Sequence, residues 1–152
     1  MRSFTIGPND AGQRMDKFIA KAVPLLPKNL MYKYLRLKRI KRNGKRCEIS
    51  TRLEEGDLVE LYINDEFFDA APEETFRFAG SMVPIIYEDE NLLLVNKPEG
   101  LVVHEDESGS PDTLIARVQK YLAEKGEYRP EEEHSFAPAL CNRIDRNTTG
   151  LV

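Results

Sequence analysis

Cysteine and histidine are scarce in this sequence, and no long hydrophobic run occurs in it. Two cysteines, Cys47 and Cys141, and two histidines are too few and too scattered for a disulfide framework or a zinc site. No apolar stretch approaches the roughly 20 residues that cross a bilayer. No apolar h-region follows the first residues, as it does in secretory signals. The sequence therefore predicts a cytoplasmic protein with reduced thiols, no metal site and no membrane contact.

Acidic residues are scarce in the first fifty positions, which hold three Asp or Glu against thirteen Lys or Arg. The remaining residues reverse this balance, with twenty-three acidic against nine basic residues, although the net charge of the whole chain is −4. Charge separation on this scale predicts two modules, the first of which binds a polyanion. A merely solvated basic face is the alternative, and it explains the tight clustering less well. The 152 residues, 41% of them hydrophobic, suffice for two small domains.

The first module is predicted to contain two short helices. Asn9 or Asp10 is expected to cap a helix over residues 11–23, and a second helix is expected over residues 27–37, with proline in its first turn. Of the two tyrosines in the second helix that could stack on bases, Tyr34 is expected to belong to the core. The predicted buried stripes are Met15, Phe18, Ile19 and Ala22 in the first helix, and Leu30, Met31, Tyr34 and Leu35 in the second.

A β-hairpin and a further strand are predicted after these helices. Asn43-Gly44 lies between two short extended runs, which is the strongest local signal for a two-residue hairpin turn. Residues 58–63 alternate between apolar and polar positions, as a half-buried strand does. Basic residues collect along the second helix and the hairpin, and such a one-sided array suits contacts with phosphates.

Two stretches of this module resemble the S4 RNA-binding domain. Residues 13–19 read Gln-Arg-Met-Asp-Lys-Phe-Ile, and residues 33–45 read Lys-Tyr-Leu-Arg-Leu-Lys-Arg-Ile-Lys-Arg-Asn-Gly-Lys. The resemblance covers residues 13–63, and it implies structured RNA as the partner without specifying any chemistry. The RNA-contacting residues that it implies are Arg14, Lys17, Lys33, Arg36, Lys38, Arg39, Lys41, Asn43 and Lys45.

The S4-like domain is expected over residues 1–65, an acidic linker over residues 66–80, and a second module over residues 81–152. The phenylalanines of the linker are expected to dock on either module. In the second module, the apolar runs and turn residues predict short strands over residues 85–87, 92–95 and 101–104, and a helix over residues 111–125 that Ser110 or Asp112 caps and Gly126 ends.

Near the end of the chain, Asp145 lies between Arg143 and Arg146 in the stretch Asn-Arg-Ile-Asp-Arg-Asn-Thr-Thr-Gly. Asn, Thr and Gly favour turns, because short polar side chains bond to nearby backbone groups and glycine accepts a positive φ. A carboxylate between two arginines is a candidate nucleophile, and the arginines are placed to hold phosphates or a displaced base. The alternative is a surface turn with a local ion pair.

Residues 86–104 resemble the opening of the RluA-type pseudouridine synthase catalytic domain, and residues 142–151 are similar to its catalytic loop. The resemblance implies that Asp145 starts the isomerisation of a uridine, by attack at C1′ of the ribose or by removal of the C2′ proton. It implies that the uracil is detached from N1 and rejoined through C5 without a metal or organic cofactor. The target base has to leave its stack to reach Asp145, and Arg143 matches the arginine that enters the RNA.

The predicted fold class is α+β: a small S4 domain of two helices and a short antiparallel sheet, followed by the incomplete start of a mixed α/β catalytic domain. In the family, histidine is usual where this chain has Asn142. The family's catalytic domain also continues well beyond the catalytic loop, with an active-site tyrosine and a basic residue that pairs with the aspartate. We therefore expect these 152 residues to be an inactive N-terminal portion.

The leading interpretation is the front portion of an RNA-uridine isomerase, and the sequence leaves two alternatives to it. In the first, the chain is an S4 module that binds RNA without chemistry. The small-subunit type of pseudouridine synthase also carries S4 domains, but the linker, the Asn-Lys-Pro-Glu-Gly turn and the Asp-Arg-Asn-Thr-Thr-Gly run fit the RluA type better. Ribosomal RNA is favoured over transfer RNA as the substrate, and a monomer is expected.

Overall fold

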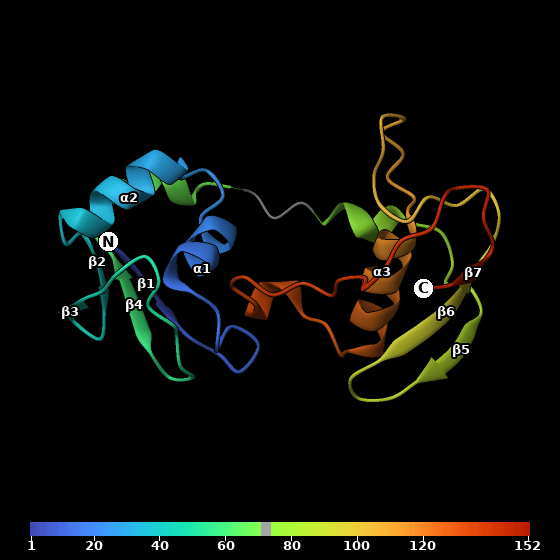
Figure 1. The fold of residues 1–152 in the computed structure, drawn as a ribbon, viewed down its shortest axis with the longest axis horizontal. Coiled ribbons are helices and arrows are strands. Elements are labelled where there is room, and N and C mark those ends of the chain that lie inside the picture. Colours follow the sequence, from blue (N-terminus) through green and yellow to red (C-terminus); the bar gives the residue numbers. More distant parts are fainter. Residues whose placement is uncertain (71–73) are drawn as a thin grey trace. The chain divides into compact units, whose positions relative to one another are not determined.

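The computed structural model describes residues 1–70 and 74–152, which form two compact units (Figure 1). Unit 1 comprises Met1–Pro72 together with Glu131–Phe136, and unit 2 comprises Glu73–Pro130 together with Ala137–Val152. Each unit has a separate cluster of buried hydrophobic side chains. Three α-helices and two antiparallel sheets occur among the described residues, so the predicted mixture of helices and strands is confirmed.

The sheet of unit 1 has the strand order β1-β4-β2-β3, with all neighbours antiparallel. Its strands are β1 (Arg2–Thr5), β2 (Ile40–Arg42), β3 (Lys45–Arg46) and β4 (Leu58–Leu61). The hairpin turn between β2 and β3 is the predicted one, since Asn43 and Gly44 both have positive φ values, 50° and 72°. Strand β1 was not predicted, because it is an edge strand whose residues are mostly exposed and lack a hydrophobic alternation.

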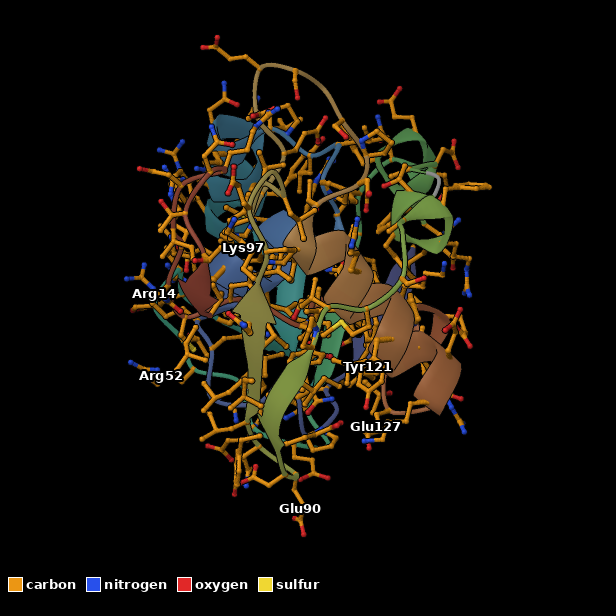
Figure 2. The ribbon with its side chains drawn as sticks, turned by 90° about the vertical axis from the view of Figure 1, so that its right-hand side faces the viewer. Arg14, Arg52, Glu90, Lys97, Tyr121 and Glu127 are labelled. Carbon is orange, nitrogen blue, oxygen red and sulfur yellow. The ribbon has the colours of Figure 1, made fainter. Side chains whose placement is uncertain are left out.

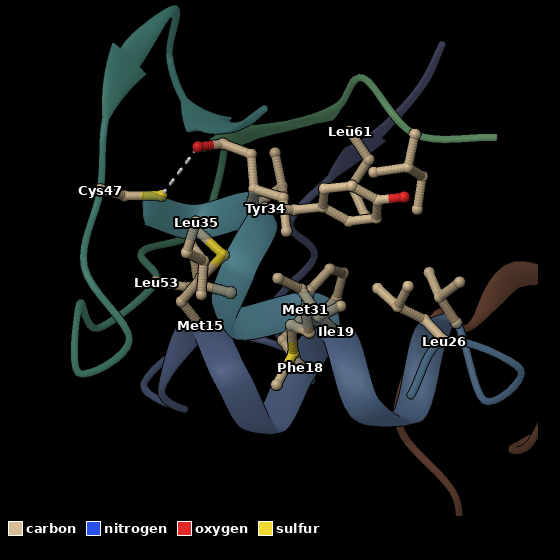
Figure 3. Close-up of a cluster of buried hydrophobic side chains, with 14 of the residues drawn as sticks. Met15, Phe18, Ile19, Leu26, Met31, Tyr34, Leu35, Cys47, Leu53 and Leu61 are labelled. Carbon is tan, nitrogen blue, oxygen red and sulfur yellow. Dashed lines mark hydrogen bonds between the residues drawn. The ribbon is translucent and has the colours of Figure 1, made fainter. Parts of the chain in front are cut away.

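The two helices of unit 1 are α1 (Met15–Ala22) and α2 (Lys28–Arg36). Figure 3 shows most of the predicted stripe residues of both helices, Met15, Phe18, Ile19, Met31, Tyr34 and Leu35, in one buried cluster with residues of the sheet. The other two, Ala22 and Leu30, are partly buried and pack against this cluster. Tyr34 is buried here, as expected. Helix α1 begins later than predicted, and the predicted capping by Asn9 or Asp10 is wrong. The Asp10 N–H bonds to the Gly7 carbonyl in a turn, and the buried Asp10 carboxylate accepts from the Ser135 hydroxyl instead of capping a helix.

Asp57 is a buried carboxylate, 6% exposed, that lies just before β4. It accepts hydrogen bonds from Arg42 Nε at 2.5 Å, from Asn43 Nδ2 at 2.8 Å and from the Glu54 backbone N–H at 2.8 Å. Burial by itself raises the pKa of this carboxyl, but these hydrogen bonds outweigh burial and lower the pKa below its usual value. The ionised carboxylate therefore fastens the hairpin turn to the loop that precedes β4.

Replacing Asp57 with asparagine is expected to destabilise unit 1 by about 2 kcal/mol at pH 7, because the Arg42 guanidinium loses its buried counter-charge. Since the folded-state pKa of Asp57 is lowered, this contribution is complete above the usual aspartate pKa and is lost as the pH falls below about 4. Amide hydrogen exchange of β4 at pH 7 and at pH 3 measures the difference between the two proteins. The exposed Glu55→Gln variant is the control. An equal penalty at both pH values contradicts this role of Asp57.

Unit 2 contains a second antiparallel sheet and one helix. Strand β6 (Leu93–Lys97) is central, with β5 (Ile85–Glu88) on one side and β7 (Gly150–Leu151) on the other. Helix α3 (Leu114–Lys125) packs with β6, because the inward residues of both elements share one cluster. The core residues of this unit are Val83, Val95, Leu101, Val103, Leu114, Val118 and Val152.

The predicted strand over residues 101–104 is wrong. Leu101, Val102 and Val103 are apolar and buried, which produced the strand prediction. Their backbone bonds to α3 instead, since the carbonyls of Val102 and Val103 accept hydrogen bonds from the first two N–H groups of that helix. The third strand of the sheet is β7, which is supplied from the far end of the chain and pairs with Asn96 and Lys97.

The start of α3 also differs from the prediction, whereas its end at Gly126 (φ 82°) is as predicted. Thr113 is the capping residue, and its hydroxyl accepts from the Ala116 N–H at 3.2 Å. Asp112 pairs instead with Arg117 at 2.8 Å and accepts from the Gly80 N–H. These two hydrogen bonds, the one from Arg117 first, lower the pKa of Asp112 to about 2. In the C-terminal half of α3, the hydroxyl of Tyr121, which Figure 2 labels, donates to Glu88 of β5 at 2.8 Å.

The segment predicted as a linker contains two 3₁₀ turns, Asp65–Phe68 and Thr75–Phe78, and its residues 71–73 lie outside the described part of the chain. Phe68 packs 6.4 Å from Phe4 in unit 1, and Phe76 packs 6.0 Å from Tyr128 in unit 2. Phenylalanines of this segment therefore dock on both units. Among the residues described, no helix has the length and apolar character that a membrane crossing requires.

Candidate active site and basic surface

Asp145 lies in a loop, residues 142–149, that leads into β7. This candidate active-site loop is called the active-site loop below. The Asp145 carbonyl accepts a hydrogen bond from the Thr148 N–H at 3.1 Å, which closes a β-turn with Arg146 and Asn147 at its centre. The predicted turn is therefore present. The Asp145 side chain is exposed, and it has no hydrogen bond or ion pair to any residue that the structure describes. A carboxylate without a partner is free to meet a substrate.

Lys97 fixes the backbone of the active-site loop through a hydrogen bond. Its side chain is fully buried at the end of β6 (Figure 2). The ammonium group donates to the carbonyls of Pro98 at 2.9 Å, Leu101 at 2.8 Å and Arg146 at 2.9 Å. The Arg146 carbonyl also accepts from the Gly100 N–H at 2.8 Å. The residue that follows Asp145 is therefore fixed by two donors from one turn, residues 97–101.

The buried ammonium of Lys97 also couples electrically to Asp145. Burial lowers the pKa of Lys97, because the charged form loses hydration, and the negative charge of Asp145 acts in the opposite direction. A lysine that donates to three carbonyls remains satisfied in this environment. Lys97 was not predicted to be a site residue. Its place in the Asn-Lys-Pro-Glu-Gly turn was the available signal, but sequence spacing does not show that this turn meets a loop almost fifty residues away.

The two arginines beside Asp145 have different environments, and neither forms with it the local ion pair of the alternative interpretation. The Arg146 guanidinium pairs with Asp106, which also accepts from the Ser108 hydroxyl and N–H. These bonds, led by the one from Ser108, lower the pKa of Asp106 to about 2. Arg143 is exposed and makes no hydrogen bond or ion pair within the described residues. Of the two guanidinium groups, Arg143 is the one that is free to contact a ligand.

Asn142 closes the base of the active-site loop. Its amide Nδ2 donates to the Leu151 carbonyl at 3.3 Å. Beyond it, Val152 and Val95 exchange two backbone hydrogen bonds, at 3.0 and 3.1 Å, which extend the β6–β7 pairing. The side chain at position 142 therefore acts on the geometry of the loop in this chain.

A second group of candidate residues forms the basic surface of unit 1. It lies where the C-terminal end of α2 runs into β2 and the β2–β3 hairpin (Figure 1). Within the described residues, Lys33, Arg36, Lys38, Lys45 and Arg46 have no acidic partner. The basic surface consists of Lys33, Arg36, Lys38, Arg39, Lys41, Lys45 and Arg46.

Lys38 is held in an unusual backbone conformation at the end of α2. Its φ is 58°, and two hydrogen bonds, from the Lys38 N–H to the Leu35 carbonyl and from the Arg39 N–H to the Tyr34 carbonyl, form a Schellman motif. Glycine is the usual residue here, and a side chain costs about 1 kcal/mol in the left-handed region. A lysine at this position points to a role for its charge.

Other predicted RNA-contacting residues have partners inside unit 1. Arg14 forms a two-pronged pair with Asp16 at 3.0 and 3.1 Å. Asn43 donates to Asp57 and accepts from the Leu58 N–H, both at 2.8 Å. The Lys41 ammonium lies 4.9 Å from the centre of the Tyr62 ring, whereas Lys17 is exposed on α1. Arg14 and Asn43 thus have a structural role in addition to any contact with RNA.

Within the part of the chain that the structure describes, no group of three or more His, Cys, Asp or Glu residues is arranged so that it could hold a metal ion. Cys47 is buried and Cys141 is exposed, and both are free thiols. Burial raises the pKa of the Cys47 thiol above its usual value. Neither cysteine therefore extends the candidate site.

Part of the chain matches a known protein family. Residues 91–152, which include the Lys97 turn and the active-site loop, match the family described as RNA pseudouridylate synthase. Over its whole length the chain is 34% identical to a protein of Mycoplasma capricolum subsp. capricolum described as an uncharacterized RNA pseudouridine synthase, and it covers 49% of that protein.

Two relatives with a named substrate are similar over nearly the whole chain. Ribosomal large subunit pseudouridine synthase D of Yersinia pestis is 31% identical over 99% of the chain, which covers 43% of that protein. Ribosomal large subunit pseudouridine synthase C of Vibrio parahaemolyticus is 30% identical over 93% of the chain, which again covers 43%. The chain spans about half the length of the curated relatives it matches.

Proposed function

Because residues 91–152 match the RNA pseudouridylate synthase family and the whole chain is similar to pseudouridine synthases, we propose that the full-length gene product isomerises uridine to pseudouridine in structured RNA. In this proposal Asp145 is the catalytic residue and Arg143 contacts the RNA around the flipped nucleotide. The N1–C1′ bond of the uridine breaks, a C5–C1′ bond forms, and the proton leaves C5 while N1 gains one. Because the product is an isomer, the reaction consumes no second substrate.

The observation that best supports this proposal is the way the chain presents Asp145. The backbone on its C-terminal side is fixed by Lys97 and Gly100, while its carboxylate is exposed and unpaired among the described residues. A rigid backbone that carries a free carboxylate is what nucleophilic or general-base chemistry on a flipped base requires. In a plain surface turn, the alternative from the sequence, no fully buried lysine is needed to hold the backbone.

We further propose that unit 1 is an S4 RNA-binding domain and that ribosomal RNA is the substrate. The basic surface, with its unpaired lysines and arginines, supports RNA contact through phosphates. The named relatives that are called ribosomal large subunit synthases support ribosomal over transfer RNA. The cytoplasmic location and the monomeric state expected from the sequence stay predictions within this proposal.

The 152 residues on their own are proposed to bind RNA without isomerising it. The relatives are about twice as long as this chain. In addition, the outer face of the unit 2 sheet is apolar and uncovered, since Tyr87, Leu94 and Leu151 are 50%, 37% and 55% exposed. Apolar residues grouped in this way mark a surface that another part of a protein covers.

Pseudouridine mapping tests the proposed function. Cellular RNA from a strain without the gene is treated with carbodiimide and read by primer extension, after complementation with the full-length gene product or with residues 1–152 alone. We expect one or more sites to return with the full-length product and none with residues 1–152. Failure of the full-length product to restore any site contradicts the enzyme and leaves an RNA-binding module. Restoration by residues 1–152 contradicts the inactivity of the shorter chain.

Removing four charges from the basic surface is expected to weaken RNA binding and to reduce its salt dependence. The variant combines Arg36→Ala, Arg39→Ala and Lys45→Ala with Lys38→Gly, because glycine suits the positive φ at position 38. If each charge contacts one phosphate, the slope of log K against log salt falls by about 3. The measurement is a titration of a labelled ribosomal RNA hairpin at several salt concentrations.

The control for this variant is Lys21→Ala, which removes an exposed charge from α1 outside the basic surface. We expect its salt slope to match that of the wild type. A fourfold variant whose slope is also unchanged contradicts the assignment of RNA binding to this surface.

A further inference from the structure

A hollow in unit 1 lies beside the basic surface and has no role in the proposed chemistry. Its volume is about 330 Å³, and it lies between α2 and the segment that follows β3. Tyr32 and Ile49 line it, and the buried Cys47 is also in its wall. A second hollow of about 250 Å³ shares Arg46 and Cys47 with the first and continues towards the hairpin turn. The hollow is within the size range of small-ligand sites.

The lining of the larger hollow combines three kinds of group. Tyr32, although partly buried against the core, contributes an aromatic side chain to the wall. Arg36 and Arg46 are exposed, and neither has a hydrogen-bond or ion-pair partner within the described part of the chain. The Glu48 carboxylate also lines the hollow without a partner among those residues. An aromatic ring, two free guanidinium groups and a free carboxylate match the base, the phosphates and the base N–H groups of a nucleotide.

We propose that this hollow binds one unpaired nucleotide of the RNA, with its base against Tyr32 and its flanking phosphates on Arg36 and Arg46. This inference rests on the proposed RNA-binding function of unit 1. It deepens that function, because a basic surface alone recognises charge and shape, whereas the hollow selects RNA with an unpaired base.

An unpaired base fits the hollow better than a base within a duplex. In A-form RNA the faces of the bases are stacked, their pairing edges are occupied, and side chains cannot enter the deep, narrow major groove. A base that is bulged or lies in a loop offers one face to an aromatic ring and its N–H groups to a carboxylate. Charge also favours this occupant, because the two arginines border the apolar wall and join the hollow to the rest of the basic surface.

The test compares two RNA hairpins that differ by one bulged guanosine, each titrated with the full-length gene product at 0.1 M salt. Guanosine is used because its base presents several N–H groups to a carboxylate. We expect the bulged hairpin to bind about tenfold more tightly, which is within the range for stacking of a single base on an aromatic side chain. Tyr32→Leu and Glu48→Ala are each expected to reduce this preference while leaving the affinity for the paired hairpin unchanged. Tyr32→Phe keeps the ring and is expected to retain the preference.

Leu37→Ala is the matched control, because Leu37 is exposed at the end of α2 and does not line the hollow. Glu48 is exposed, so the result of Glu48→Ala does not depend on the packing around Tyr32. Equal affinity of the wild type for both hairpins, with steep salt dependence, overturns the nucleotide site and leaves the RNA-binding surface standing. A preference that persists in both Tyr32→Leu and Glu48→Ala also overturns it. Absence of binding to either hairpin overturns the site together with the proposed RNA-binding function.

Discussion

Replacing Asp145 with alanine or asparagine is expected to abolish pseudouridine formation by the full-length gene product while its affinity for RNA stays unchanged. Loss of a catalytic nucleophile or base reduces turnover on the order of 10⁴-fold or more. The fold should be unaffected, because the Asp145 side chain is exposed and makes no hydrogen bond among the described residues, while its carbonyl, which bonds to Thr148, is retained in both variants. Release of tritium from RNA that carries [5-³H]uridine, under single-turnover conditions, measures the chemical step.

The two Asp145 substitutions separate charge from shape. Asparagine keeps the size of the side chain and removes its charge, so equal losses in both variants attribute the effect to the carboxylate. Glu107→Gln serves as the control, because Glu107 is an exposed carboxylate in the loop that contains Asp106. We expect this control to keep its activity. Turnover by Asp145→Asn at the wild-type rate would show that the chemistry lies elsewhere.

We expect Lys97→Met to destabilise unit 2. We also expect it to lower the activity by more than the loss of folded protein accounts for. Methionine fills much of the same volume but removes three hydrogen bonds, which leaves the carbonyls of Pro98 and Leu101 without this donor and the carbonyl of Arg146 with the Gly100 N–H alone. Loss of partners for buried polar groups costs about 3 kcal/mol or more in total. Since Arg146 follows Asp145 directly, the loss also loosens the backbone that presents the carboxylate.

The Gly100 amide provides a local readout for Lys97→Met, because its hydrogen bond to the Arg146 carbonyl joins the turn to the active-site loop. We expect its hydrogen exchange to accelerate more than exchange in β6 does. Lys120→Met is the matched control, since Lys120 donates to a single carbonyl, that of Ala79, at 2.8 Å. If both variants lower stability equally and leave Gly100 exchange equally protected, Lys97 does not hold the loop.

Elements whose structure is decided by local physics were predicted correctly from the sequence. The Asn43-Gly44 turn is present because two adjacent positive φ values suit these two residues. Most residues of the α1 and α2 stripes lie in the core of unit 1, because a 3.6-residue period places them on one face of each helix (Figure 3). In the same way, Gly126 ends α3 in a left-handed conformation.

The errors occurred where a local signal competes with a distant partner. Asp10 has the chemistry of a helix cap, but its carboxylate accepts from Ser135, more than a hundred residues later. Leu101, Val102 and Val103 are apolar like a buried strand, but the carbonyls of Val102 and Val103 bond to the start of α3. In both cases the local sequence indicated burial or polarity correctly but not the hydrogen-bonding partner. A short sequence window holds no information on which distant group lies beside it in the folded protein.

The sequence by itself determined the identity of the candidate site, since Asp145, Arg143 and the turn around them can be read from nine consecutive residues. It also determined the charge separation on which the proposed RNA contact of unit 1 rests. Only the tertiary structure decided which groups hold Asp145 and which cations are free. Lys97 reaches the active-site loop because β7 pairs with β6, and Arg146 is occupied because the loop that contains Asp106 lies beside it. The physical reason is that hydrogen bonds and ion pairs depend on distance in space, which the chain sets only when it folds.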